Sequence, residues 1–192
     1  MKKLLITGFD CFDAQSLNPS WEAVRRLPDT VGEYALCRLM LHTLYEKAAE
    51  ELFRVAEIYK PDVIISVGQA GGRDAVTPER IAVNIRAARI GDNDGVILDG
   101  DRIAPDGPAA YFSTLPVEAM RDAIRAAGIP SAVSNTAGAF VCNDVMYSAL
   151  HRYAGTSVRC GFIHVPYLPE QGQPNMSLDR TIAALIAAIE VL

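Results

Sequence analysis

The chain has 192 residues, of which 50% are hydrophobic and 21% charged, and its formal net charge is −5 at pH 7. This length suits one compact domain with a substantial core and is too short for two, so we expect a single domain over residues 1–192. The mildly acidic charge excludes the basic footprint of a nucleic-acid-binding protein, and no apolar run approaches the ~20 residues of a membrane helix, so we expect neither nucleic acid nor a membrane as a partner.

The first third of the chain alternates strand and helix patterns. NPSWEAVRRL predicts a helix with Asn18 as its N-cap and Pro19 at its first position. LYEKAAEELFRVAEIY predicts an amphipathic helix, and the apolar run DVIISVG is typical of a central parallel strand covered on both faces. The predicted strands are 3–8, 33–41 and 62–68, and the predicted helices are 18–27 and 44–59.

The rest of the chain continues this alternation. RIAVNIRAARI alternates polar and apolar residues like a strand, and VEAMRDAIRAAG predicts a helix that ends at Gly128. The strand in CGFIHVPYLP stops at Pro166, and a closing helix is capped by Ser177. The predicted strands are 80–90, 131–135 and 160–165, and the predicted helices lie in 117–128, 136–153 and 177–192.

Alternating strands and helices predict an α/β fold, a three-layer α/β/α sandwich around a mostly parallel twisted sheet. The functional site of such a sheet lies at the carboxyl ends of its strands, where loops and helix starts converge. The loops expected there are rich in glycine, asparagine, aromatic and titratable residues. They are TGFDCFDAQSLN, VGQAGGRDAVTPE, SNTAGAF and HVPYLPEQ.

The cysteines favour a reducing compartment. No two of them have Cys-x-x-Cys spacing, so neither a zinc ribbon nor a redox dithiol is indicated. The opening MKKLLITGFD has too few apolar residues before Gly8 for the apolar region of a signal peptide. We therefore expect free thiols and a cytoplasmic location. The cysteines are Cys11, Cys37, Cys142 and Cys160.

Cys142 stands in the first turn of the helix predicted within TAGAFVCNDVMYSALHRY, residues 136–153. Backbone N–H groups at a helix start lack intrahelical partners, and together with the helix dipole they stabilise a thiolate. This position makes Cys142 a candidate nucleophile. The alternative is that Cys142 is a small buried hydrophobic residue, as free cysteines commonly are.

Three histidines are available as a base for this thiol. His151 lies nine residues after Cys142 on the same helix, which places it on the opposite face and roughly 13 Å along the axis, so it is excluded. His42 follows a predicted strand and stays open. His164 ends the apolar strand GFIHV, at the edge where the cysteine helix begins, and is the favoured base; alone, it would equally fit a hydrogen-bonded core histidine.

A histidine base needs an acceptor that fixes its tautomer and ring orientation. Glu79 in the loop GGRDAVTPER is the favoured acceptor, followed by Asp144 and Asp74. Asp144 would oppose thiolate formation if it pointed inward. The alternative for Glu79 is a solvated loop carboxylate paired with Arg73 or Arg80.

Five collinear segments resemble the pyroglutamyl peptidase type I family of cysteine peptidases: TGFDCFDAQSLNPS, GQAGGRDAVTPERIAVNI, RIGDNDG, SNTAGAFVCNDVMY and GFIHVPYLPEQ. The resemblance covers nearly the whole chain. It implies an α/β/α sandwich, often a homotetramer, that acts on N-terminally pyroglutamylated peptides without a metal or cofactor. It assigns Cys142 as nucleophile, His164 as general base and acid, and Glu79 as the orienting carboxylate.

The mechanism that the resemblance implies is acyl transfer. Cys142 attacks the carbonyl that follows the pyroglutamyl ring, and helix-start N–H groups receive the oxyanion, an effect of about 3 kcal/mol per donor. His164 protonates the leaving amine and then activates water against the thioester. Arg89 resembles a family arginine near the site, and we expect it to assist the oxyanion; the alternative is a structural salt bridge to Asp92 or Asp94.

The substrate pocket that the resemblance implies uses Phe9, Phe12, Asn18, Thr43 and Gln69. Pyroglutamate has no α-amino charge, and its lactam offers one donor and one acceptor on an apolar ring, so a neutral site with aromatic walls suits it. Alternatively, Phe9 and Phe12 are core residues beneath the loop, and Asn18 is only the helix cap.

The chain departs from the family pattern at five positions near this pocket. Cys11 stands where the family usually has proline, and Asp13 and Ala14 replace a glycine pair. His42 and Gly91 each replace a proline. We expect these changes to alter the shape of the first loop while leaving the three catalytic positions intact. His42, so near the pocket, is also expected to affect pH dependence.

Two rival functions compete with peptidase activity. GQAGGR follows a strand and suggests the phosphate-binding loop of a phosphorylase-like enzyme, but it lacks the Gly-Lys-Ser/Thr of a P-loop and Gly-x-Gly-x-x-Gly spacing. The second rival is a non-catalytic relative that binds pyroglutamyl peptides without cleaving them. The presence of cysteine, histidine and glutamate together favours the enzyme.

Overall fold

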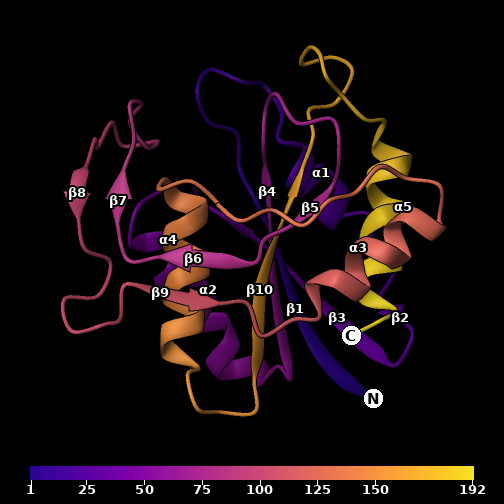
Figure 1. Cartoon of the computed structure of the whole chain (residues 1–192), viewed down its shortest axis with the longest axis horizontal. Helices are drawn as coiled ribbons and strands as arrows, with labels where there is room; N and C mark the ends of the chain where they lie inside the picture. Colours follow the sequence, from indigo (N-terminus) through magenta and orange to yellow (C-terminus); the bar gives the residue numbers. More distant parts are fainter.

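The computed structural model describes residues 1–192, and its centre is one six-stranded sheet in the order β2-β3-β1-β4-β10-β5 (Figure 1). Strands β3, β1, β4 and β10 run parallel, and the short edge strands β2 and β5 run antiparallel. The strands are β1 (Lys2–Phe9), β2 (Thr30–Val31), β3 (Tyr34–Leu41), β4 (Val63–Gln69), β5 (Thr77–Pro78) and β10 (Arg159–Val165).

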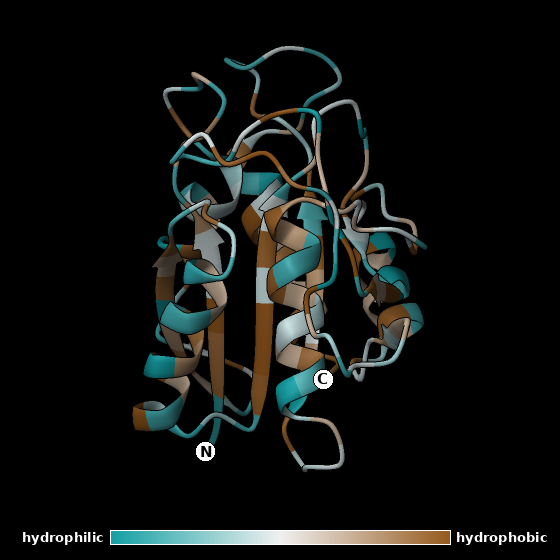
Figure 2. Cartoon of the chain, turned by 90° about the vertical axis from the view of Figure 1, so that its left-hand side faces the viewer, coloured by the Kyte–Doolittle hydropathy of each residue, from teal (hydrophilic) through white to brown (hydrophobic).

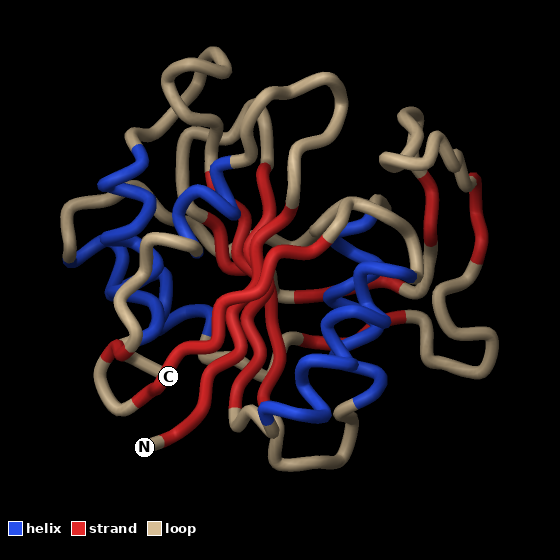
Figure 3. Tube along the Cα trace, turned by 180° about the vertical axis from the view of Figure 1, so that it is seen from behind, coloured by secondary structure: helices blue, strands red, loops and turns tan.

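Helices cover both faces of this sheet, which confirms the predicted sandwich (Figure 3). One layer contains α1 (Pro19–Val24), α3 (Val117–Ala126) and α5 (Leu178–Ile189), and the other contains α2 (Lys47–Tyr59) and α4 (Val141–Arg152). Between the two layers the central strands are strongly apolar (Figure 2).

Alternation along each strand divides the core into two halves. On β4, Val67 packs toward the layer of α1, α3 and α5, whereas Ile64 packs toward α2 and α4. On β10, Val165 belongs to the first half, and Phe162 belongs to the second. The same alternation determines which side chains at the ends of the strands lie on the same face of the sheet.

The predicted strand over 80–90 is wrong as a single element. The chain forms two short strands there, β6 (Ile81–Val83) and β7 (Arg86–Ala87), which pair with β9 (Ala110–Phe112) and β8 (Asp99–Asp101) in separate two-stranded sheets. The side chain of Asn143 on α4 bonds the backbone of Val83 and the carbonyl of Ile85, so this segment lies over α4 and outside the main sheet.

The predicted strand over 131–135 is also wrong, because that segment makes only isolated bridges, Val76 with Ser131 and Glu79 with Ser134. The other predicted elements are present, with ends shifted by a few residues. Asn18 caps α1 as expected, accepting from Ser20 N–H at 3.0 Å. Ser177 occupies the N-cap of α5, but its side chain makes no capping bond.

The loops that follow β1, β4 and β10 leave the sheet at one end, the top of Figure 1. Parallel strands require this, since their carboxyl ends share an edge. None of the helices combines the length and the apolar character that crossing a bilayer demands.

Candidate functional site

Cys142 and His164 lie on the same face of the sheet, beside Gly68. His164 is two residues after Phe162 on β10, so it shares the α4 side, and the two rings lie 4.7 Å apart. His164 pairs with Gly68 across the β4–β10 ladder. A Cβ added to Gly68 would lie 2.9 Å from Sγ of Cys142. The thiol and the imidazole therefore flank one glycine.

Glu79 is fully buried and contacts the imidazole directly. Its Oε1 lies 2.7 Å from Nδ1 of His164, and its backbone N–H donates to the carbonyl of Phe162 at 2.9 Å. Arg73 Nη1 donates to the same Oε1 at 2.6 Å. Glu79 is thus no solvated carboxylate; of its two expected arginine partners, Arg73 is the one it binds, while Arg80 pairs with Glu118.

The other two carboxylates weighed for this role lie elsewhere. Asp144 is buried in an ion pair with Arg86 at 3.0 Å, and its Oδ2 accepts from Glu46 N–H at 2.9 Å. Asp74 is exposed. Asp144 therefore anchors α4 and does not orient His164.

The first turn of α4 presents free backbone donors around the thiol. Cys142 is the second residue of the helix, and the N–H of Asp144 is the first to bond back, to Phe140 O at 3.1 Å. The N–H groups that precede Asp144 have no intrahelical acceptor. Asn143 fastens this turn to β6 through two bonds to Val83. The helix start is thus a fixed set of donors beside Sγ.

Opposing effects act on the thiol of Cys142, which is partly exposed. Burial raises the pKa of Cys142 to about 12, the charge of Glu79 raises it further, and Arg73 opposes them. Burial lowers the pKa of His164, although its bond to Glu79 acts in the opposite direction. Sγ lies beside Gly68, and the donors at the helix start oppose the effect of burial. Both shifts favour the neutral pair, a thiol beside an uncharged imidazole.

We expect alkylation of resting Cys142 by iodoacetamide to be slow at pH 7 and to accelerate as the pH rises, because the thiolate is the reactive form. Peptide mapping by mass spectrometry measures the rate at Cys142 separately from the exposed Cys11. Fast alkylation at a constant rate from about pH 5 to 8 would instead indicate a thiolate–imidazolium pair.

The two predicted pocket phenylalanines lie around the thiol and imidazole. Phe9 is buried at the end of β1, with its ring 6.2 Å from that of Phe162. Phe12 is half-buried in the following loop, with its ring 6.0 Å from that of Phe140, the residue before α4. The pocket role and the core role that the sequence allowed both fit Phe9.

Asn18 and Thr43 bind Asp10, a residue that the sequence patterns did not single out. Nδ2 of Asn18 donates to Asp10 O, and Oγ1 of Thr43 donates to Asp10 Oδ1, both at 2.8 Å. The only signal for Asp10 was its position directly after a buried strand. His42, which stayed open as a base, lies 2.8 Å from Asp10 Oδ2, and this bond raises the pKa of His42.

Gln69 ends β4 and binds a second residue that the sequence patterns missed, Gln171. By strand alternation its side chain lies on the face of Val67, opposite Gly68. Its Oε1 accepts from Gln171 Nε2 at 2.7 Å, and Gln171 also lies within 3.3 Å of Gln15 Oε1. This amide cluster joins the loop after β1 to the loop after β10.

Arg89 lies exposed after β7 and makes no hydrogen bond or ion pair with Glu79 or His164, so its oxyanion role stays a prediction. The alternative salt bridge is not formed. Asp94 pairs with Lys47 at 2.6 Å, and Asp92 accepts from the backbone N–H groups of Asp94 and Val96.

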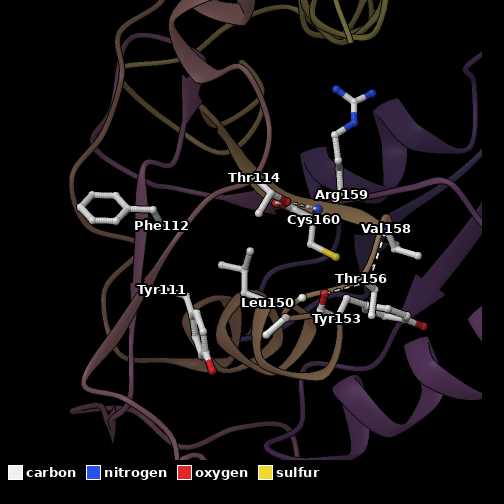
Figure 4. Close-up of a pocket in the computed structure, with 11 residues that line it drawn as sticks. Tyr111, Phe112, Thr114, Leu150, Tyr153, Thr156, Val158, Arg159 and Cys160 are labelled. Atoms are coloured by element: carbon white, nitrogen blue, oxygen red, sulfur yellow. Dashed lines mark hydrogen bonds between the residues drawn. The ribbon is translucent and has the colours of Figure 1, made fainter.

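A separate cavity of about 300 Å³ opens at the amino end of β10 (Figure 4). It is lined by Leu150, Tyr153 and Cys160 among others, and lies about four strand residues, ~13 Å, from His164. Burial also raises the pKa of Cys160 to about 12. Cys160 is therefore a buried thiol that lacks an imidazole and a helix start, whereas Cys142 is partly exposed, and Cys160 serves as a control for Cys142.

Comparison with known proteins assigns the family. The model of the pyroglutamyl peptidase family matches residues 2–192. The pyrrolidone-carboxylate peptidase of Levilactobacillus brevis is 48% identical, over 99% of this chain and 97% of that protein, and that of Bacillus subtilis is 46% identical, over 98% and 91%.

Solved structures agree with the sequence matches. The crystal structure of Bacillus amyloliquefaciens pyroglutamyl peptidase I superposes with a TM-score of 0.97 at 43% identity, covering 100% of this chain and 96% of that one. The pyrrolidone carboxyl peptidase of Thermococcus litoralis gives a TM-score of 0.94 at 39% identity, covering 100% and 93%. The chain belongs to the pyroglutamyl peptidase family.

Proposed function

We propose that the chain hydrolyses the peptide bond after an N-terminal pyroglutamyl residue, with Cys142 as nucleophile, His164 as base and acid, and Glu79 as the orienting carboxylate. The observation that carries the assignment is the 2.7 Å contact of Glu79 with His164, on the sheet face that also holds Cys142. Membership of the family supplies the substrate class.

The reaction begins from the neutral pair. As Sγ of Cys142 attacks the substrate carbonyl, its proton passes to Nε2 of His164, and Glu79 stabilises the imidazolium through Nδ1. The N–H groups at the start of α4 receive the oxyanion. The C–N bond then breaks, and the leaving amine takes the proton from His164.

Water completes the cycle. The pyroglutamyl group is held as a thioester on Cys142, and His164, neutral again, takes a proton from the attacking water. The C–S bond breaks, free pyroglutamate leaves, and the proton returns to the thiolate. The water supplies the OH of the product acid and the proton that restores the thiol.

The pocket suits an uncharged ring. Phe9 and Phe12 supply apolar walls near the end of β1, and no charged side chain is needed because the lactam has no ionised amine. Asn18 and Thr43 act through Asp10, which they hold in place between the first loop and the β3–α2 connection. The side chain of Gln69 binds Gln171, so we assign only the backbone of Gln69 to the substrate pocket.

For location and assembly, we propose a cytoplasmic homotetramer. The four free cysteines support a reducing compartment. The exposed apolar side chains of Ile90, Val96 and Ile97, on the β7–β8 connection, support burial against another copy. Light scattering coupled to size exclusion measures the mass in solution, and a monomer at micromolar concentration would contradict the assembly.

The test of the function is release of a reporter amine from a pyroglutamyl amide, with the prolyl amide as the matched control that lacks the lactam carbonyl. We expect release from the first substrate only. Binding of the pyroglutamyl amide without release would favour the non-catalytic relative. Phosphate-dependent cleavage of a nucleoside would favour the phosphorylase that the GQAGGR loop suggested.

We expect Gly68→Ala to lower kcat on this substrate at least tenfold. The added Cβ would lie 2.9 Å from Sγ of Cys142 and 2.7 Å from the Phe162 ring, so the thiol must move, and displacement of a reacting atom by about 1 Å costs on the order of 10²-fold. Thermal unfolding checks that the variant is folded. A folded variant with unchanged kcat would show that Sγ does not react from this position.

A further inference from the structure

Arg73 contacts the same carboxylate oxygen as the imidazole. Its Nη1 donates to Glu79 Oε1 at 2.6 Å, and Nδ1 of His164 lies 2.7 Å from that atom. Glu79 is fully buried, whereas the Arg73 side chain is 29% exposed. The guanidinium therefore enters from the surface and closes the outer side of the Glu79–His164 pair.

The same guanidinium joins two segments of the site. Nη1 also lies 2.6 Å from Thr77 Oγ1 on β5, and Nη2 donates to the carbonyl of Thr136 at 3.0 Å. Thr136 belongs to the loop that leads into α4, and its Oγ1 accepts from Gly138 N–H at 3.1 Å. Arg73 thus ties the carboxylate to the loop that carries Cys142.

Arg73 and Glu79 act in opposite directions on both reacting groups. The negative charge of Glu79 raises the pKa of His164 and of Cys142, and the positive charge of Arg73 lowers both. A buried carboxylate without this partner would favour the imidazolium, which cannot accept a proton from the thiol.

We propose that Arg73 is a positioning residue of the peptidase, which shares Oε1 of Glu79 with His164 and fixes the loop before α4. The proposal rests on the proposed function, because it concerns the same catalytic residues. Arg73 acts through Glu79 and the loop and does not itself contact the thiol. A planar guanidinium is suited to this role, since it donates to the carboxylate and to a carbonyl from one rigid fork.

The test measures kcat and KM of Arg73→Gln and Arg73→Lys on the pyroglutamyl amide, from about pH 5 to 9. In Arg73→Gln, we expect kcat to fall at least tenfold with KM within about twofold. We also expect the acidic limb of its pH profile to move to higher pH, because His164 loses the positive charge that lowers its pKa. Arg73→Lys keeps the positive charge, so we expect the acidic limb of its pH profile to stay in place. Its kcat falls because one ammonium cannot donate to the carboxylate and to the carbonyl in the geometry of the guanidinium.

Arg80→Gln is the matched control. Arg80 follows Glu79 directly but points away from it, donating to Glu118 at 2.5 Å and to Asn135 at 2.9 Å. We expect its kcat and pH profile to equal those of the wild type. Thermal unfolding of each variant separates loss of fold from loss of positioning, and if Arg73→Gln does not fold, Arg73→Lys carries the test.

Several outcomes would overturn the proposal: wild-type kcat in Arg73→Lys, an unmoved acidic limb in folded Arg73→Gln, or an equal loss in Arg80→Gln. Failure of the proposed function is distinguishable, because it would appear as absent hydrolysis by the wild type. Hydrolysis by the wild type with no effect at Arg73 overturns this inference alone.

Discussion

Cys142→Ser lowers kcat/KM on a pyroglutamyl amide by at least about 10³-fold, the scale of losing a nucleophile in an acyl-transfer site. The serine hydroxyl occupies the same position at the start of α4, but it is far less acidic than the thiol. Burial lowers the pKa of His164, which makes proton transfer to it from an alcohol less favourable than from a thiol. Release of the reporter amine from purified variant and wild type measures the effect.

Cys160→Ser is the control for this result. Cys160 is 1% exposed, and burial raises its pKa to about 12, like that of Cys142, but it lies at the amino end of β10. We expect activity within about twofold of the wild type and a stability loss of about 1 kcal/mol from the buried hydroxyl. Equal loss of activity in both variants would show that thiol substitution acts through the fold, and Cys142 would lose its assignment.

Glu79→Gln lowers kcat by about 10³-fold or more, comparable to replacing the carboxylate of a serine-protease triad by its amide. The amide loses the charge that stabilises the imidazolium, and its NH2 group can face Nδ1 and select the wrong tautomer. Arg73 also loses its ion-pair partner. Steady-state kinetics on the pyroglutamyl amide measure the loss.

Glu118→Gln is the matched control for Glu79. Glu118 pairs with Arg80 at 2.5 Å on the surface, so the same chemical change there removes only an exposed ion pair, which contributes little to stability. We expect wild-type kcat. A fully active Glu79→Gln would contradict the proposal that the carboxylate orients and stabilises His164 during catalysis. Its contact with His164 would then serve only the fold.

The placement of Cys142 and His164 at one edge of the sheet was predictable because strand and helix ends are marked in the sequence. Pro166 stops the strand of His164 two residues later, and the small residues of TAGAF precede the helix of Cys142. In a parallel sheet, these marks suffice to place both groups at one edge. The alternation of side chains along each strand then determines which of them face α4 at that edge.

Other features depend on contacts between distant segments, which local patterns do not encode. The alternation in 80–90 is real, but Asn143 and Asp144 on α4 determine where that segment packs. The pKa of Cys142 depends on burial beside Gly68, and the partner of Arg73 depends on the path of the loop after β4. Helix-end electrostatics alone does not include the effect of this burial on the thiol.

Two residues of the first loop have left-handed backbone. Asp13 and Ala14, where the resemblance to the family leads us to expect a glycine pair, have φ of 52° and 57°. Glycine reaches this region at no steric cost, whereas residues with a Cβ do not. The loop therefore keeps a glycine-like path with residues that disfavour it, beside Phe12 of the pocket.

The most direct measurement of the central claim is the mass of the protein quenched in acid during turnover of a pyroglutamyl ester or amide. We expect a covalent adduct of one pyroglutamyl group, which peptide mapping locates on Cys142 and which hydroxylamine removes, as it does a thioester. Hydrolysis with the pyroglutamyl group attached to another residue would contradict a nucleophilic Cys142 assisted by His164 and Glu79.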